Sequence, residues 1–216
     1  MSSEAPFQEV VSSIDELRTL YHQPHPIVVA KERPLLDAAT TTFIERATFA
    51  AIGTHAADGS ADVSPRGGPS GFIQVLDERR LAIGDLGGNN RLDTIENIIA
   101  TGQIGMLIIH PGRTETVRVN GRAWITRDPA LLERFPFARR PTTAIGVEVV
   151  GTYIHCAKAF LRSGIWQPET WSAFLDAPDG ADILACQKVV DVAAQVVRDD
   201  LDRGYAAALE YEATPG

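Results

Sequence analysis

The stretch GDLGGNNRLDTIEN, Gly84–Asn97, concentrates residue types that suit the binding of an anion. It follows the apolar run RLAI and leads into a helical pattern, for which Asn89 or Asn90 is a good N-cap and Asp93 is the acid expected in a capping box. A helix N-terminus presents free N–H groups and the positive end of its dipole, and Arg91 adds a planar charged fork for phosphate oxygens. The spacing predicts a phosphate site, with a tight capped turn as the alternative.

Two strand-like runs carry further polar candidates. In DVSPRGGPSG, Asp62–Gly71, proline and glycine interrupt the strand, which leaves Ser64 and Arg66 beside glycine backbone that a flat ligand could approach. The alternative is a wide loop between two strands. In RTETVRVNGRA, Thr116 and Arg118 alternate along a strand and therefore share one face. That face is either part of a binding site or simply solvated.

The segment HCAKAFLRSGIW places Lys158, Arg162 and Trp166 four residues apart. On a helix this spacing gives one cationic face that ends in an aromatic side chain, and an amphipathic helix with Trp166 in the core or an interface is the alternative. His155 and Cys156 are adjacent, so on a strand they would point to opposite faces. We therefore predict no thiol mechanism, and the chain shows no other dedicated nucleophile, so its catalytic residues stay unassigned.

Composition narrows the function classes. Lys and Arg number 20 against 28 Asp and Glu, a formal net charge of −8, which argues against general affinity for nucleic acid or an anionic membrane. The two cysteines stand far apart and outside metal-ligand spacings, so we predict neither a disulfide framework nor a metal site. The opening residues MSSEAPFQEVVSS do not resemble a signal peptide, and no apolar run reaches membrane-spanning length. We expect a cytoplasmic protein.

The elements that position these residues follow from periodicity. Seven short apolar or alternating runs rich in Val, Ile and Thr predict a mostly antiparallel barrel over residues 48–156. Asp58–Gly59 is a two-residue hairpin signal, whereas Asn120–Gly121 is expected to form a bend or bulge inside one long strand. The barrel is preceded by an N-terminal helical segment, residues 1–47, and followed by a C-terminal helical region, residues 157–216, within one structural domain.

Helices are expected in both flanking regions and once inside the barrel. The patterns predict helices over residues 13–22, 35–47 and 90–101. A long C-terminal helix over residues 181–209 would lie against the barrel or a second subunit, with its apolar residues at helical spacing. Those residues are Leu184, Val189, Val192, Val196, Val197 and Leu201.

Taken in order, DVSPRG, GNNRLDT, GRTETVRVNG and HCAKAFLRSGIW resemble the motifs of the pyridoxamine 5′-phosphate oxidase-like family of FMN-binding split-barrel flavoproteins. The resemblance extends from about Pro24 to Pro168. It implies a mainly β fold, a six-stranded antiparallel split barrel with flanking helices. It also implies a homodimer that holds two FMN molecules at the subunit interface.

The resemblance assigns roles by position. Arg66, Asn89, Asn90 and Arg91 would hold the FMN phosphate. The remaining cofactor-binding residues that it implies are Val63, Ser64 and Pro65 along the isoalloxazine ring, Gly84 and Asp85 at the flavin or ribityl chain, Thr116 and Arg118 at the phosphate or ribityl chain, and Lys158, Arg162 and Trp166 reaching across from the partner subunit.

The implied function is that of an FMN-dependent oxidoreductase acting on a small organic substrate, with NAD(P)H as a candidate electron donor. The ending AALEYEATPG lacks the arginine-containing segment with which pyridoxamine 5′-phosphate oxidase grips its own substrate, so we do not expect vitamin B6 oxidation. The sequence leaves two alternatives open. One is a non-catalytic flavin-binding or storage protein, and the other is a split barrel that uses F420 or haem.

Overall fold

The computed structural model describes residues 6–188 and 192–215. They fall into two compact units, which divide between Glu32 and Arg33. The first unit contains α1 (Ile14–Leu20) and α2 (Pro26–Ala30). The expected N-cap of α1 is present, because the Ser13 side chain accepts a hydrogen bond from the backbone N–H of Glu16.

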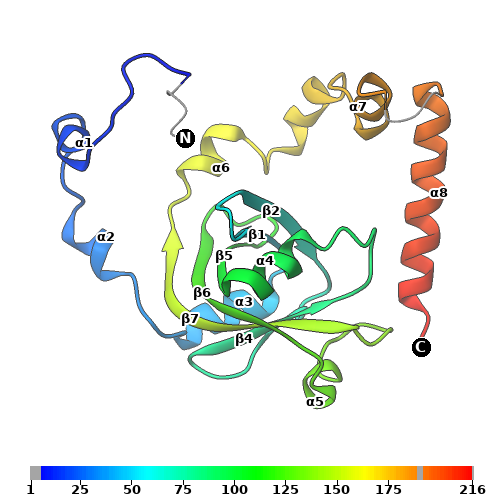
Figure 1. Cartoon of the computed structure of the whole chain (residues 1–216), viewed down its shortest axis with the longest axis horizontal. Coiled ribbons are helices and arrows are strands. Elements are labelled where there is room, and N and C mark those ends of the chain that lie inside the picture. The colour runs from blue at the N-terminus through cyan, green and yellow to red at the C-terminus, as the bar shows by residue number, and fades with distance from the viewer. Residues whose placement is uncertain (1–5, 189–191, 216) are drawn as a thin grey trace. The chain divides into compact units, whose positions relative to one another are not determined.

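The second unit is built on one curled antiparallel sheet (Figure 1). Its strands follow the order β2-β1-β5-β6-β7-β4-β3, and each of the seven coincides with one of the seven runs predicted from the sequence, whereas the family resemblance implied six. The strands are β1 (Phe49–His55), β2 (Ala61–Gly67), β3 (Ile73–Val75), β4 (Arg80–Asp85), β5 (Gln103–Ile109), β6 (Thr116–Thr126) and β7 (Thr143–His155). The expected mainly β split-barrel architecture is confirmed.

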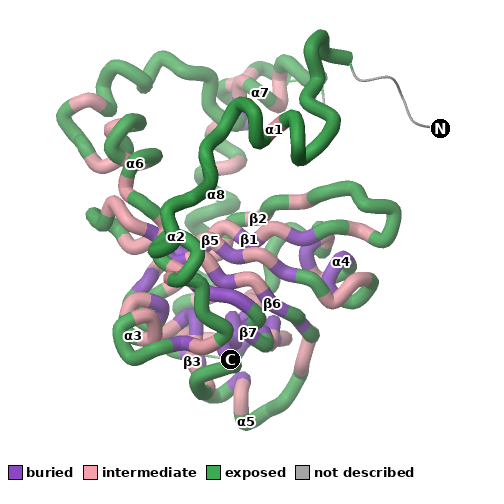
Figure 2. The backbone as a smooth tube through the Cα atoms, turned by 90° about the vertical axis from the view of Figure 1, so that its left-hand side faces the viewer, coloured by how far each residue is buried: buried purple, intermediate pink, exposed green. Residues whose placement is uncertain are grey.

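The main core lies inside the curl of the sheet. Alternate residues of β1 and β5 point inward, among them Ile52, Met106 and Ile108, and α3 (Ala38–Arg46) adds Ile44. Each such side chain stabilises the fold by about 1.5–3 kcal/mol when it is fully removed from water. Figure 2 shows the buried residues gathered on the strands, whereas α6 and α8 are mostly exposed.

The Asn120–Gly121 signal behaves as expected, since β6 is one continuous strand with a register shift at this point. Asn120 faces Gly151 and Gly121 faces Val149, so the extra residue, Val150, belongs to β7. A Cβ on Gly121 would lie 2.2 Å from the carbonyl oxygen of Glu148. Close approach of the two backbones therefore requires glycine here.

The Asp58–Gly59 turn also joins two strands as expected, but through a longer loop. The backbone N–H of Ala56 donates to the Ser60 carbonyl at 2.8 Å, which leaves three residues in the loop. Gly59 has φ +86°, the left-handed conformation that closes such three-residue hairpins.

One helix, α4 (Asp93–Thr101), connects β4 to β5 and packs mainly against β1. Its buried face is partly polar. Asn97 Nδ2 donates to Thr54 Oγ1 at 3.1 Å, and Thr94 Oγ1 donates to Asp62 Oδ2 at 3.3 Å. These bonds tie α4 to β1 and β2, so they fix the position of the loop that precedes the helix.

The C-terminal region contains α6 (Lys158–Ser163), the 3-10 helix η1 (Pro168–Phe174), α7 (Gly180–Cys186) and α8 (Ala194–Ala213). The helix predicted over residues 181–209 is instead divided in two, because α7 ends at Cys186 and α8 begins at Ala194. Lys188 has φ +53° and Ala193 is extended, so the chain cannot continue as one helix from residue 181. Val189 lies outside the described residues.

The remaining short helix, α5 (Pro129–Leu132), was not predicted. Asp128 caps it, and Leu132 packs with Phe135, Ala82 and Ala144 in a second small core. Among the described residues, every helix is too short or too polar to pass through a lipid bilayer.

Candidate functional site

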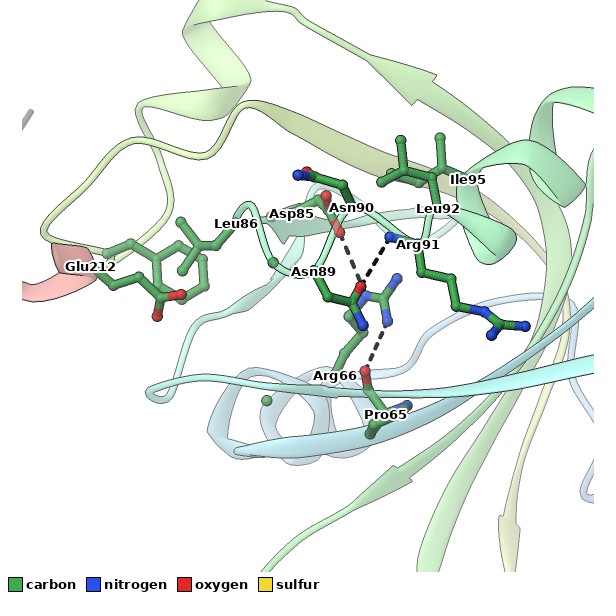
Figure 3. A pocket seen from close by; sticks show the side chains of 14 residues that line it. Pro65, Arg66, Asp85, Leu86, Asn89, Asn90, Arg91, Leu92, Ile95 and Glu212 are labelled. Atoms are coloured by element: carbon green, nitrogen blue, oxygen red, sulfur yellow. Dashed lines mark hydrogen bonds and ion pairs between the residues drawn. The ribbon is translucent and has the colours of Figure 1, made fainter. Parts of the chain in front are cut away.

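A pocket of about 250 Å³ lies where the ends of β2 and β4 meet the loop before α4 (Figure 3). It brings together several of the residues predicted from the sequence, namely Pro65, Arg66, Gly84, Asp85, Asn89, Asn90 and Arg91. The other lining residues are Gly67, Leu86, Gly88, Leu92, Ile95, Phe137 and Glu212. Segments that are separate in the sequence therefore form one concave polar surface.

The loop before α4 differs from the expected cap. Neither Asn89 nor Asn90 is the N-cap: the helix starts at Asp93 after Leu92, and no side chain caps its first turn. Asn90 has φ +59°, a left-handed conformation that asparagine tolerates, and this turns the chain before the helix can begin. Asn89 Oδ1 instead accepts a hydrogen bond from the Arg91 backbone N–H at 3.0 Å.

The N-terminus of α4 is open to an anion. The first N–H groups of a helix have no partner within the helix, and a capping side chain would occupy some of them. Because α4 has no such cap, the backbone N–H groups of its first turn remain available to a bound anion. Leu92 and Ile95, at the start of this helix, line the pocket.

Arg66 is positioned inside the pocket by two acceptors. Its Nη1 donates to the Pro65 carbonyl at 2.8 Å, and its Nε lies 3.6 Å from Asp85 Oδ1. The side chains of Arg66 and Asp85 are 23% and 17% exposed, so this ion pair is mostly shielded from water. Burial raises the pKa of the Asp85 carboxyl, an effect that the charge of Arg66 partly offsets.

Arg91 is held differently. Its Nε donates to Asp93 Oδ2 at 2.5 Å, and its side chain is 79% exposed. The hydrogen bond with Asp93 and the negative charge of Asp93 both raise the pKa of Arg91. In Figure 3 the Arg91 side chain extends away from Arg66. Asp93 therefore pairs with Arg91 and does not complete the predicted capping box.

Glycine is required at position 84, because the pocket wall is closely packed there. A Cβ on Gly84 would lie 2.9 Å from ring atom Cε2 of Phe137, 2.9 Å from Cγ of Pro141 and 3.0 Å from Cγ of Phe135. Gly84 therefore allows β4 to pass directly beneath the segment that leads into β7.

Other predicted residues lie on the outer face of the sheet. Strand register places Pro65, Ala51, Leu107 and Arg118 in one row across β2, β1, β5 and β6. Adjacent strands are about 4.8 Å apart, so Pro65 and Arg118 are separated by roughly 14 Å along this row. Arg66, the next residue after Pro65, pairs with the buried Ala50 and so lies on the opposite face of the sheet, so within one chain Arg118 and Arg66 do not share a phosphate.

The local environments of the remaining strand residues also differ. Val63 is 72% exposed, Ser64 Oγ donates to Asp62 Oδ2 at 3.2 Å, and Thr116 is buried. Arg118 Nη1 donates to the hydroxyl oxygen of Tyr153 at 2.8 Å. None of Val63, Ser64, Thr116 and Arg118 lines the pocket.

The C-terminal candidates are also outside the pocket. Lys158 and Arg162 are exposed on α6, as their helical spacing predicted. Trp166 is not on that helix, because α6 ends before Gly164, whose φ is +62°. Its indole Nε1 donates to the Arg113 carbonyl at 2.8 Å, and its ring meets Phe160 edge-on at 5.8 Å between centroids.

Two pocket residues lie outside the stretches that the sequence motifs mark. Phe137 follows α5, and Glu212 belongs to the last turn of α8, where the neighbouring Tyr211 lies beneath the Arg139 guanidinium at 3.8 Å from the ring centroid. No local motif marks either residue. Their place in the pocket depends on contacts between distant parts of the chain.

Comparison with known proteins identifies the family. A family model described as pyridoxamine 5′-phosphate oxidase matches residues 36–154, which is more than half of the chain. No curated protein matches the chain.

Similar solved structures include HupZ from Group A Streptococcus, with 17% identity over 55% of this chain and 92% of that chain and a TM-score of 0.44. A second is a putative pyridoxamine 5′-phosphate oxidase from Lactobacillus delbrueckii, with 19% identity, coverage of 56% and 95%, and a TM-score of 0.44. A third is an F420 reductase, with 21% identity, coverage of 51% and 93%, and a TM-score of 0.39. On the strength of the family model, the chain belongs to the pyridoxamine 5′-phosphate oxidase-like family.

Proposed function

We propose that this protein binds FMN and acts as an FMN-dependent oxidoreductase on a small organic substrate. The observation that carries the proposal is the pocket in which Arg66, Asn89 and the uncapped N-terminus of α4 converge. A phosphate dianion needs several convergent donors. In a chain with a net charge of −8, such donors must be concentrated locally.

The pocket suits the phosphate end of FMN in its chemistry. Arg66 supplies a shielded positive charge, the Asn89 and Asn90 amides supply donors, and the first turn of α4 supplies backbone N–H groups. Arg91 reaches the same phosphate once it exchanges Asp93 for a phosphate oxygen. Gly84 and Asp85 then lie beside the ribityl chain, and the flavin ring follows Val63, Ser64 and Pro65 along β2.

The site is completed by a second copy of the chain. Thr116 and Arg118 are separated from Arg66 by two intervening strands, so they contact the cofactor that is held mainly by the partner. Lys158, Arg162 and Trp166 likewise reach across from the α6 region. FMN binding and dimerisation are then thermodynamically linked, because each stabilises the other.

When bound, FMN supplies the hydride and electron chemistry. The protein's residues bind its phosphate, orient its ring and set the polarity around it. Because FMN carries the reaction, the protein needs no dedicated nucleophile, in agreement with its sequence. NAD(P)H is the proposed electron donor, and the cytoplasm is the proposed location.

The deciding experiment is a visible absorption spectrum of the purified protein without added cofactor, followed by identification of any chromophore released on denaturation. Flavin bands and released FMN support the proposal, whereas released haem or F420 replaces it with one of the alternatives. A colourless protein that also fails to take up added FMN contradicts it. Turnover of NAD(P)H by the flavin-loaded protein then separates an oxidoreductase from a flavin-storage protein.

A further inference from the structure

Asp85 places a carboxylate inside the pocket where the phosphate is proposed to bind. Asp85 lies 3.6 Å from Arg66, the shielded cation of that site, and its side chain is 17% exposed. A carboxylate in this place repels a phosphate that binds Arg66. Once the phosphate is bound, keeping Asp85 ionised beside it would be energetically unfavourable.

The other charged groups that line the pocket are Arg66 from β2, Arg91 from the loop before α4, and Glu212 from α8. The negative charges of Asp93 and Asp62 both raise the pKa of Arg91. Asp93 is already paired with Arg91, and Glu212 lies at the far side of the pocket beside Leu86 in Figure 3. Asp85 is therefore the carboxylate most directly affected when a phosphate takes Arg66.

We propose that Asp85 is an internal counter-ion that the FMN phosphate displaces from Arg66, so that FMN binding is coupled to the uptake of a proton by the Asp85 carboxylate. This inference rests on the proposed FMN site. In the free protein the ion pair keeps Arg66 pointed into the pocket and compensates its charge. In the complex the phosphate oxygens take over Arg66, and a proton from water neutralises Asp85.

The direction of the coupling follows from the environment of Asp85. Burial already raises its pKa in the free protein, and Arg66 opposes that rise. A bound phosphate both withdraws Arg66 and adds a nearby negative charge, and each change raises the pKa further. A group whose pKa rises on binding takes up protons, so the affinity for FMN increases as the pH falls through the interval between the two pKa values.

The test is isothermal titration of FMN into the wild-type protein and Asp85→Asn, in buffers of different ionisation enthalpy, between pH 5.5 and 8.5. The phosphate of FMN titrates in both proteins, so the difference between them reports Asp85. We expect the wild type to take up more protons per FMN than Asp85→Asn. We also expect Asp85→Asn to bind FMN about tenfold more tightly at the highest pH, a difference that shrinks as the pH falls.

Asp77→Asn is the matched control, because Asp77 forms an exposed pair with Arg80 in the turn between β3 and β4. This variant should take up the same number of protons as the wild type. Asp85→Ser removes the carboxylate with a smaller side chain and replaces Asp85→Asn if that variant does not fold. Riboflavin, which lacks the phosphate, should bind the wild type and the Asp85 variants without the pH-dependent difference.

The outcomes separate the two proposals. If all the proteins bind FMN, but proton uptake is equal in the wild type and the Asp85 variants, the counter-ion proposal is wrong and the FMN site stands. If the wild type binds no FMN at any pH, the proposed function itself fails.

Discussion

Asp93 Oδ2 accepts a hydrogen bond from Arg91 Nε at 2.5 Å, so the arginine that the GGNNR motif assigns to a phosphate is already engaged within its own loop. The pair is exposed to solvent and is worth little to the stability of the fold. Its importance lies in binding, because a phosphate must compete with Asp93 for Arg91.

The first prediction concerns this competition. Asp93→Asn should strengthen FMN binding a few-fold, because it releases Arg91 and removes a negative charge from the helix N-terminus. Arg91→Ala should weaken binding by about tenfold, as expected for the loss of one charge-assisted contact. Fluorescence titration of FMN measures both. Weaker binding by Asp93→Asn would show that Asp93 organises the loop more than it competes with the ligand.

A second prediction tests the close packing at Gly84. Gly84→Ala should lower the free energy of unfolding by about 1–3 kcal/mol, because its Cβ would crowd Phe135, Phe137 and Pro141. Urea denaturation provides the measurement. Gly87→Ala is the control, since a Cβ at position 87 meets no atom within 4 Å, and its effect should stay within about 0.5 kcal/mol. Equal stability of the two variants would contradict the proposed packing.

The third prediction tests whether two chains share one site. Arg66→Ala and Arg162→Ala homodimers should each bind FMN weakly. A mixed dimer purified with two different tags should recover one site of normal affinity, because both lesions fall in the other site. As a control, pairing Arg66→Ala with Asn89→Ala should restore nothing, since each site then carries one lesion. Failure of the first pair to recover binding would place Arg162 outside the partner's site.

The fourth prediction concerns α7 and α8. Asp179 caps α7, and its carboxylate accepts a hydrogen bond from Arg198 Nε at 2.6 Å, which lowers the pKa of Asp179 to about 2. Because this pKa is depressed, the contribution of Asp179 is present above about pH 4 and is lost as the pH falls toward 2.

Hydrogen exchange of α7 and α8 at pH 5 and pH 3 measures this effect as a change in protection. Asp179→Asn should show reduced protection already at pH 5, whereas Asp176→Asn, in the preceding loop, should behave as the wild type. Protection that is unchanged in Asp179→Asn would assign the packing of α7 on α8 to their apolar contacts alone, such as those of the buried Val197.

Local sequence was sufficient for the strands and most helices of this fold. Short apolar or alternating runs marked all seven strands, and alternation indicates a strand that buries one face. Asn120–Gly121 marked the bulge, since a register shift there brings two backbones too close for a side chain. The same local logic failed at Asn89 and Asn90, where a left-handed residue, rather than a side-chain cap, precedes α4.

The assembled pocket depended on the tertiary structure. The order β2-β1-β5-β6-β7-β4-β3 carries Arg118 away from Arg66, whereas the curl of the sheet brings Arg66 from one end of that order to Asp85 near the other. Phe137 and Glu212 join them without any motif. Periodicity and capping depend on residues close in the sequence, so the sequence alone determined the strands, most helices and the candidate polar residues. Which of those residues meet depends on register and on packing between distant segments, and only the folded chain decides it.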